Sequence, residues 1–250
     1  MKKNKKREFI MKKIDKELIA AVQKDDVKAV GALVGKGANV NIKNKYGQSL
    51  LQMALFKGAR NLFETLLTLG ADVNQKDDFG IPCLHHAIRL NRLKMMRRLL
   101  CEEKIDVNQT DRYGFTALHV ASFAGLDLAD LSLLVGAGAH LNQKNAWGDT
   151  ALFSASTIKT VENLLYLGVN PFVENRWGEK ACDYFKRRAF SRQKEILSFL
   201  KYLQMADRLR HCSPQLTVVE ESKRRLNYLR QIQGNFFLKY KKLIWQNDRG

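Results

Sequence analysis

The sequence predicts an all-α solenoid of about five to six stacked helix-turn-helix units, with projecting β-turn loops, here called fingers, between them. Three observations predict it. An aromatic residue followed by glycine recurs at spacings of 33, 34, 34 and 30 residues. Leucine and alanine then recur at fixed positions after each glycine, and a segment ending in asparagine recurs about twenty residues later. A fixed period near 33 residues indicates units that bury one continuous core by stacking.

The motifs keep the same register from unit to unit. The aromatic-glycine pairs are Tyr46-Gly47, Phe79-Gly80, Tyr113-Gly114, Trp147-Gly148 and Trp177-Gly178. The segments from the first four glycines read GQSLLQMA, GIPCLHHA, GFTALHVA and GDTALFSA. The segments that leave the second helices read GANVN, GADVN, KIDVN and GAHLN. The run Thr116–Ala121 resembles the T-P-L-H-x-A signature of ankyrin repeats at every position except the proline.

This resemblance to ankyrin-repeat proteins covers roughly residues 14–204 and implies a binding scaffold. We expect a basic N-terminal segment at 1–13, an array at 14–204 and a basic helical tail at 205–250. The predicted units are 14–44, 45–77, 78–111, 112–145, 146–175 and 176–204. The first unit lacks a finger and the last is strongly charged, so each is expected to cap one end of the stack.

Local signals place the ends of the helices and mark two irregular units. Thr116 and Thr150 are expected to precede helices, with hydroxyls that accept from free N–H groups. Glycine follows most second helices and favours a left-handed helix end. The third unit has Cys101–Lys104 there instead, which predicts an altered end. The fifth unit is three or four residues short around 156–160, so we expect less regular stacking and easier opening there.

Charge is concentrated at the two ends of the chain. Residues 1–13 carry a formal charge of +6, residues 14–175 carry +1 and residues 176–250 carry +11. Basic ends favour an anionic partner, although charge alone also serves solubility. The start has no apolar segment typical of a signal peptide, and the four cysteines are scattered, with Cys83 and Cys101 expected to be buried. These observations predict a cytoplasmic protein.

The tail has apolar residues at helical spacing from Leu226 to Leu243, interspersed with basic residues. Three interpretations remain open. The tail could fold back as a cap, dock into the apolar groove of a partner, or lie on an anionic membrane surface. The residues expected to make tail contacts are Arg224, Arg225, Arg230, Phe236, Phe237, Lys241, Lys242 and Trp245.

The sequence favours a protein without catalytic activity, cofactor or metal. It has no glycine-rich phosphate loop, no G-x-S-x-G and no H-E-x-x-H motif. His85 and His119 occupy the histidine position of the repeat signature, and the resemblance implies that they form hydrogen bonds between neighbouring fingers. Nucleic acid is a poor candidate partner because no recognition motif is present and the repeat region is nearly neutral.

The aromatic residues of the fingers are the predicted binding surface. The resemblance implies that partners meet the fingertips and the first helices. We expect aromatic anchors about 10 Å apart, although an aromatic side chain can also pack on the adjacent finger. Arginines beside them favour an acidic epitope. The predicted protein-binding residues are Tyr46, Phe79, Arg112, Tyr113, Trp147, Arg176, Trp177, Phe56, Leu90 and Phe123.

These observations predict a non-enzymatic adaptor that binds a partner protein through its fingertips and concave face. The alternative is a peripheral membrane protein, or a secreted bacterial effector, whose basic tail is the functional element. The Lys- and Asn-rich sequence is similar in style to ankyrin proteins of intracellular bacteria, which would place it in the host-cell cytosol. The sequence does not predict the oligomeric state.

Overall fold

The computed structural model describes the backbone of residues 2–187 and the side chains of residues 13–187. All of these lie in the first of the two units into which the chain divides, Met1–Leu200. Between residues 2 and 187 the structure has ten α-helices, one 3-10 helix and no named strand. The second helix predicted for the last unit, the basic tail with its contact residues, and Cys212 fall outside the described residues.

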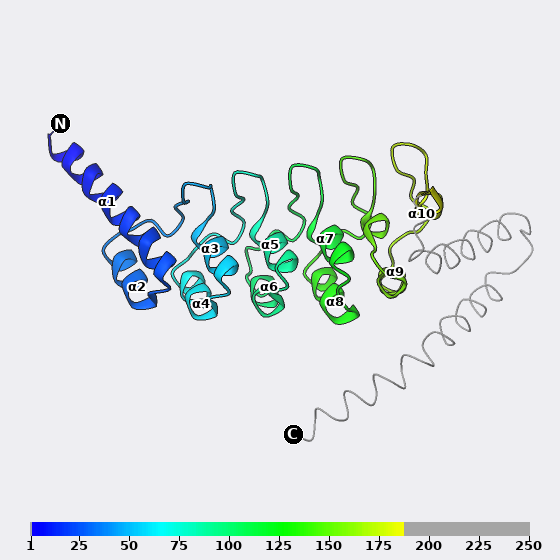
Figure 1. Ribbon diagram of the computed structural model, residues 1–250, viewed down its shortest axis with the longest axis horizontal. Helices are drawn as coiled ribbons and strands as arrows, with labels where there is room; N and C mark the ends of the chain where they lie inside the picture. Colours follow the sequence, from blue (N-terminus) through cyan, green and yellow to red (C-terminus); the bar gives the residue numbers. More distant parts are fainter. Residues whose placement is uncertain (1, 188–250) are drawn as a thin grey trace, which may run out of the picture. The chain divides into compact units, whose positions relative to one another are not determined.

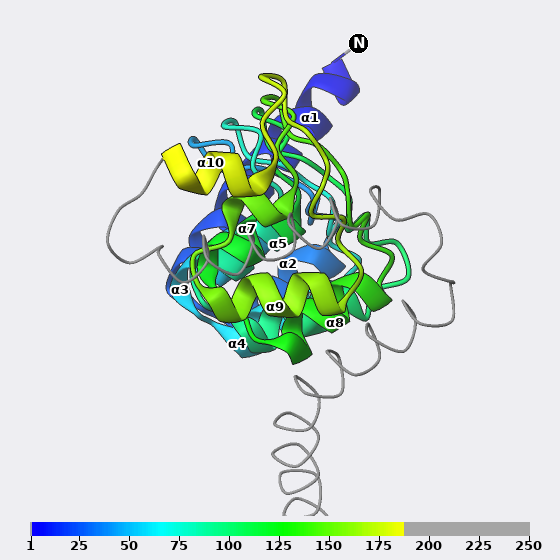
Figure 2. The ribbon, with the colours of Figure 1, turned by 90° about the vertical axis from the view of Figure 1, so that its right-hand side faces the viewer.

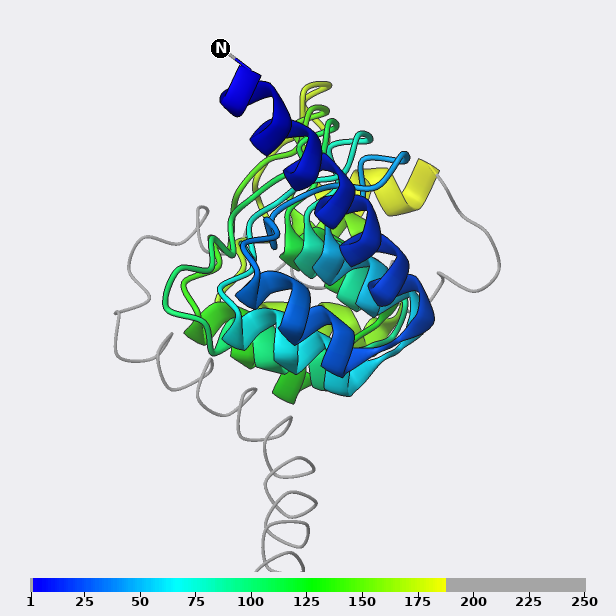
Figure 3. The same ribbon diagram turned by 90° about the vertical axis from the view of Figure 1, so that its left-hand side faces the viewer.

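The helices form pairs that stack side by side, with the fingers projecting on one side (Figure 1). The pairs are α1 (Lys2–Lys24) with α2 (Val27–Gly35), α3 (Leu50–Lys57) with α4 (Arg60–Thr68), α5 (Cys83–Arg89) with α6 (Leu93–Leu100), α7 (Ala117–Ala124) with α8 (Leu128–Gly136), and η1 (Ala151–Ser154) with α9 (Ile158–Tyr166). The first helix of the next unit, α10 (Ala181–Arg187), follows. End-on views show the first helices in one layer, between the fingers and the second helices (Figures 2 and 3). The all-α ankyrin-type solenoid is confirmed.

Each finger is held in a tight loop by its own side chain. An Asn or Asp at the start of the turn accepts from the backbone N–H groups two and four residues later, as Asp111 Oδ1 does from Tyr113 at 2.9 Å and Phe115 at 3.0 Å. The equivalent residues are Asn44, Asp77, Asn145 and Asn175. These bonds satisfy the turn amides locally, so the predicted fingers form without a continuous sheet.

The core lies between the two helix layers and continues from unit to unit. Leu51 and Leu55 of α3 and Phe63 and Leu66 of α4 are at most 1% exposed. Each such side chain stabilises the fold by about 1.5–3 kcal/mol through burial. Ala54, Ala87 and Ala121, the alanines of the repeat signature, are fully buried where neighbouring helices approach.

The two predicted threonine caps differ. Thr116 forms a full capping box, in which its hydroxyl accepts from the His119 N–H and His119 Nδ1 accepts from the Thr116 N–H. Thr150 precedes a 3-10 helix and makes no capping hydrogen bond. The capping prediction for Thr150 was therefore wrong, and its buried hydroxyl has no hydrogen-bond partner. In the preceding unit His119 pairs with the equivalent threonine, but here Phe153 occupies the histidine position and has no polar atom.

The end of α6 is altered as predicted. Gly70 and Gly138 take left-handed conformations after α4 and α8, whereas no residue in 101–104 has a positive φ. Cys101 is the residue that ends α6, and it is exposed, contrary to the expectation that it is buried. Its Sγ donates to the Arg97 carbonyl at 3.3 Å. Cys83 is buried as expected, and burial raises the pKa of its thiol.

The fifth unit has lost about one helical turn from its first helix. The 3-10 helix η1 has four residues, whereas α7 has eight, and Ala155 leaves it in an extended conformation. Its second helix α9 keeps nine residues, as many as α8. The shortening therefore falls in the first helix, and the expectation that the turn is shortened was wrong, because residues 155–157 form a turn as long as residues 125–127. At the other end of the array, α1 runs without interruption from the basic segment into the first unit.

Candidate binding groove

The five aromatic residues of the fingertips are exposed, although their side chains are large and apolar. Trp147 is 37% exposed, and Tyr46, Phe79, Tyr113 and Trp177 are between 51% and 61% exposed. The loop geometry explains this, because each aromatic residue sits between the Asn or Asp that closes the turn and a glycine with positive φ. The side chains therefore project from the tips of the fingers.

The fingertip aromatics are not evenly spaced. The rings of Tyr113 and Trp147 stack with centroids 5.7 Å apart and planes inclined by 24°. The Phe115 ring lies 5.6 Å from Trp147 in a tilted arrangement. The expected spacing of about 10 Å was therefore wrong for this pair, because the two fingers approach closely enough for their backbones to bond. Ala146 N–H donates to the Tyr113 carbonyl at 2.9 Å.

The two predicted arginines have different surroundings. Arg112 Nε donates to the Phe79 carbonyl at 2.8 Å, and its guanidinium lies 5.6 Å from the centre of the Phe79 ring. Its side chain thus ties two fingers together while its charge stays at the surface. Arg176 is exposed, and its backbone N–H donates to the Trp147 carbonyl at 3.0 Å.

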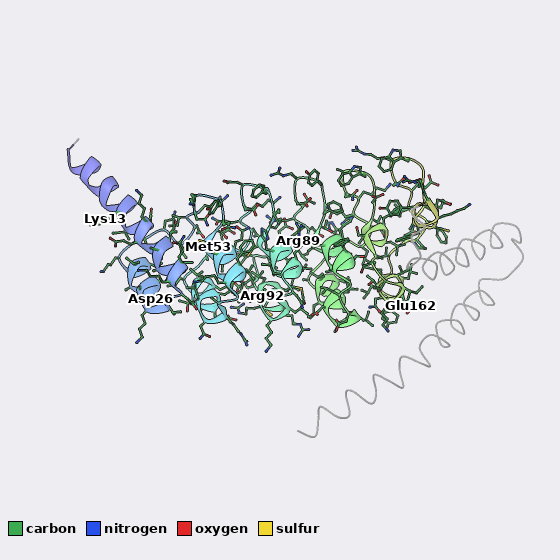
Figure 4. All side chains as sticks on the ribbon, in the orientation of Figure 1. Lys13, Asp26, Met53, Arg89, Arg92 and Glu162 are labelled. Atoms are coloured by element: carbon green, nitrogen blue, oxygen red, sulfur yellow. The ribbon has the colours of Figure 1, made fainter. Side chains whose placement is uncertain are left out.

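A second row of residues lies on the exposed face of the first helices. Phe56, Arg89 and Phe123 occupy the same position in consecutive units, four residues after Gln52, His85 and His119 respectively. Phe123 is 74% exposed, Phe56 is also exposed, and Arg89 projects from α5 (Figure 4). Leu90, which follows Arg89, is half-buried and contributes less surface.

A groove of about 1550 Å³ joins the two rows between residues 79 and 187. Of the predicted residues, those that line it are Phe79, Arg112, Tyr113, Phe123, Trp147 and Trp177. Tyr46, Phe56, Leu90 and Arg176 do not line it. The groove also contains Arg89, which lies beside the predicted Leu90, and residues that the sequence reasoning missed: Ile81, Phe115, Phe153, Tyr184 and Arg187. Ile81 and Phe115 could have been predicted from their position directly after the finger glycine.

Hydrogen bonds from the first helices hold the fingers over this groove. The third residue of α3, α5 and α7 donates to a backbone carbonyl in the next finger, and we call this contact the cross-unit bond. Gln52 Nε2 donates to Ile81 at 2.9 Å, His85 Nε2 to Phe115 at 2.8 Å and His119 Nε2 to Asp149 at 2.9 Å. The role that the resemblance implied for His85 and His119 is confirmed.

The carbonyl acceptors fix the tautomers of both histidines, because Nε2 must carry the proton. His119 Nδ1 then accepts from the Thr116 N–H. His85 Nδ1 has no partner, since the equivalent residue is Pro82, which has no N–H. Burial lowers the pKa of His85 to about 4, although its bond to the Phe115 carbonyl opposes that shift. Burial also lowers the pKa of His119.

The cross-unit bond is missing in the fifth unit. Phe153 is the third residue of η1 and has no polar atom to offer the next finger. Its ring packs edge-on against Tyr184 of α10 at 5.4 Å. An aromatic contact therefore replaces the polar bond at this joint.

The charged side chains of the groove are unequally compensated. Asp111 accepts from two amides of its own finger, Asp149 Oδ1 accepts from Asn175, and Glu179 pairs with Arg187. Arg187 lowers the pKa of Glu179 through that hydrogen bond. Among the described side chains, none forms an ion pair with Arg89. The groove thus presents apolar rings and two cations, Arg89 and Arg112, that form no ion pair with a described side chain.

Two searches for other kinds of site gave no candidates. In the described part of the chain, no group of three or more His, Cys, Asp or Glu residues could hold a metal ion. Nor does any helix among these residues combine the length and apolar character needed to cross a membrane.

Comparison with known proteins identifies the family. Two family models match, "Ankyrin repeats (3 copies)" at residues 57–145 and 84–175, and "Ankyrin repeats (many copies)" at 18–67. The E3 ubiquitin-protein ligase KEG of Arabidopsis thaliana is 35% identical over 83 residues, which are 33% of this chain and 5% of that protein. An ankyrin repeat protein of Rickettsia felis is 42% identical over 53 residues, 21% of this chain and 14% of that protein.

The chain spans only 5% to 15% of the length of the curated relatives it matches. Among solved structures, EF0377, an ankyrin repeat protein, matches 74% of this chain and 97% of its own. Its TM-score is 0.64 at 22% sequence identity, so it supports the fold. Together the family models cover residues 18–175. The chain therefore belongs to the ankyrin-repeat family, whose repeats are generally protein–protein interaction modules and generally not enzymes.

Proposed function

We propose that this chain is a non-enzymatic adaptor that binds a partner protein through the groove between its fingers and first helices. The observation that carries the proposal is the convergence of exposed aromatic residues on one groove: Tyr113, Trp147 and Trp177 from the fingers and Phe123 from α7. Large apolar side chains left in water favour a partner that covers them, and aromatic residues dominate binding hot spots.

The proposed partner presents an acidic epitope. Arg89 has no carboxylate against it, and Arg112 is held by carbonyl oxygens that leave its charge uncompensated. The carboxylates of the groove already accept hydrogen bonds from the protein itself. A partner carboxylate would therefore find free cations here, and we place the adaptor in the cytoplasm.

Substitution of both Tyr113 and Trp147 by alanine tests the proposal. The partner is first captured on the full-length chain and identified by mass spectrometry, and its Kd is then measured by calorimetry. We expect the double variant to bind at least tenfold more weakly, about 1.4 kcal/mol, with a melting temperature within a few degrees of the parent. A matched control removes two exposed tyrosines outside the groove, Tyr46 and Tyr166. Equal affinity of both variants would contradict the proposal.

A second candidate function rests on the formal charge of +11 in residues 176–250. In this alternative the basic tail binds an anionic membrane surface, in a peripheral protein or in an effector delivered to the host-cell cytosol. Co-sedimentation of the full-length chain and a 1–204 truncation with phosphatidylserine vesicles distinguishes the two. Binding that is lost with the truncation and at high salt would favour the tail, whereas unchanged capture of the protein partner by the truncation favours the groove.

A further inference from the structure

The shortened first helix of the fifth unit leaves a notch in the groove. In the second, third and fourth units, the first helix continues to Phe56, Arg89 and Phe123, which are all exposed. In the fifth unit η1 ends at Ser154, so no helical residue continues this row. The residues that line the groove around the missing turn, here called the notch, are Phe123, Ala124, Phe153, Ser154, Ala155 and Ser156.

The notch has apolar walls and a backbone that is not helical. Phe123 is 74% exposed on one wall, and Phe153 with Tyr184 forms the other. Ala155 and Thr157 are extended, with ψ of 126° and 158°, and Ser156 between them is exposed. A large apolar side chain placed in the notch would remove the exposed Phe123 ring from water while its own backbone stayed at the rim.

Arg89 lies two units away from the notch along the same row of first-helix residues. Arg89 is in the third unit, Phe123 in the fourth and the notch in the fifth. Packed helices lie about 8–10 Å apart, so about 16–20 Å separate Arg89 from the notch. An extended peptide advances about 3.3 Å per residue, so five or six residues span this distance.

We propose that the groove binds an extended peptide segment of a partner protein, with a large apolar side chain in the notch and a carboxylate side chain on Arg89, about five or six residues apart. This inference rests on the proposed function and specifies the chemistry of the partner. The carboxylate follows from the surroundings of the groove arginines: Arg187 pairs with Glu179 and Arg112 is hydrogen-bonded to finger carbonyls, whereas Arg89 has neither kind of partner among the described residues. The apolar residue follows from the exposed Phe123 wall and the missing helical turn.

Selection of a displayed library of random 12-residue peptides on the full-length chain tests the proposal. We expect enriched peptides in which Asp or Glu precedes or follows Leu, Phe or Trp by about five or six positions. The charge reversal Arg89→Glu should exchange the acidic residue for Lys or Arg at the same spacing. Ser154→Trp, which fills the notch, should weaken the enriched peptides at least tenfold, whereas the control Tyr46→Ala outside the groove should leave their affinity unchanged.

The outcomes separate this inference from the proposed function. If peptides are enriched and depend on Tyr113 and Trp147, but show no acidic-apolar spacing and tolerate Ser154→Trp, the notch assignment is wrong while the binding groove stands. If no peptide is enriched but binding of the protein partner still depends on Tyr113 and Trp147, the groove recognises a folded surface. The proposal of an extended peptide ligand is then overturned. Should Ser154→Trp fail to fold by circular dichroism, the charge exchange at the exposed Arg89 still decides the proposal.

Discussion

Neighbouring units are joined by two different kinds of contact. The joints from the second unit to the fifth use a hydrogen bond, and the joint between the fifth and sixth units uses an aromatic contact. At the earlier joints the third residue of the first helix, Gln52, His85 or His119, donates to the carbonyl of the next finger. At the last described joint Phe153 makes an aromatic contact with Tyr184 instead. The difference teaches that the helix layer and the finger layer can be joined independently of each other.

The finger layer also changes along the chain. Early fingers are joined by side chains, as Lys43 donates to the Lys76 carbonyl and Lys76 to the Thr110 carbonyl. Later fingers add backbone bonds, through the N–H groups of Ala146 and Arg176, while Lys144 still donates to the Glu174 carbonyl. The fourth and fifth units are therefore joined through both layers, whereas the fifth and sixth units keep the finger bonds without the cross-unit bond.

The largest effect is expected where two fingers touch through their backbones. Gly114 has a φ of +78°, and a Cβ there would lie 2.9 Å from Ala146 N. Gly114→Ala should lower the free energy of unfolding by about 3–4 kcal/mol, through left-handed strain and overlap with the next finger. Gly80→Ala is the control, because its nearest contact is 3.6 Å, and it should cost only about 1–2 kcal/mol. Equal losses in urea denaturation would show that the late fingers are not joined more closely.

Acid should weaken the joints that use histidine. The pKa of His85 falls from its ordinary 6.5 to about 4 in the folded protein. Between these pH values the unfolded chain binds a proton that the folded chain excludes, so stability is lost as the pH falls through that window. The loss should reach about 3 kcal/mol near pH 4.

The control for this prediction is His85→Gln, because Gln52 makes the same cross-unit bond without a titrating group. Urea denaturation between pH 7 and pH 4 should show a smaller loss of stability in this variant. If the parent and the variant lose stability equally, the acid sensitivity has another origin.

Hydrogen exchange should detect the missing cross-unit bond. The buried residues Val161 and Leu164 of α9 correspond to Leu131 and Leu134 of α8. We expect the α9 amides to exchange about 30-fold faster, a difference of about 2 kcal/mol in local opening free energy. Equal protection of the two helices would mean that the Phe153–Tyr184 contact fully replaces the hydrogen bond.

Two buried threonines give the smallest and most direct test. Thr116→Val removes a hydroxyl that caps α7 and bonds to His119, and should destabilise the protein by about 1–2 kcal/mol. Thr150→Val removes a buried hydroxyl without a partner, and should be neutral or stabilise by about 1 kcal/mol. Thermal denaturation of the two variants measures the contrast, and a loss of stability in both would indicate that Thr150 bonds to an ordered water.

The parts of the fold that follow from local rules could be predicted from the sequence. The finger glycines, the altered end of α6 and the exposure of the fingertip aromatics depend on neighbours within a few residues. The cross-unit bonds of His85 and His119 could be expected from the resemblance, because one histidine position repeats with the units.

Other features depend on contacts that sequence spacing does not contain. The stacking of Tyr113 on Trp147 depends on how closely two fingers approach, and the groove depends on which residues of four fingers face the helices. Four missing residues could have shortened a turn or a helix, and only the helix bounds, four residues in η1 against eight in α7, show that the helix was shortened. Cys83 and Cys101 lie in the same unit and were both expected to be buried, yet the place of Cys101 at the end of α6 leaves it exposed.

Each cross-unit bond ends on a main-chain carbonyl, and this has a consequence for how such a chain can change over generations. Ile81 and Phe115 have apolar side chains of different shape and Asp149 has a charged one, but each offers the same acceptor. A unit can therefore be duplicated, deleted or exchanged in the gene without a matching substitution in its neighbour. The recognition surface can thus change one unit at a time during evolution, while the bonds that join the units stay the same.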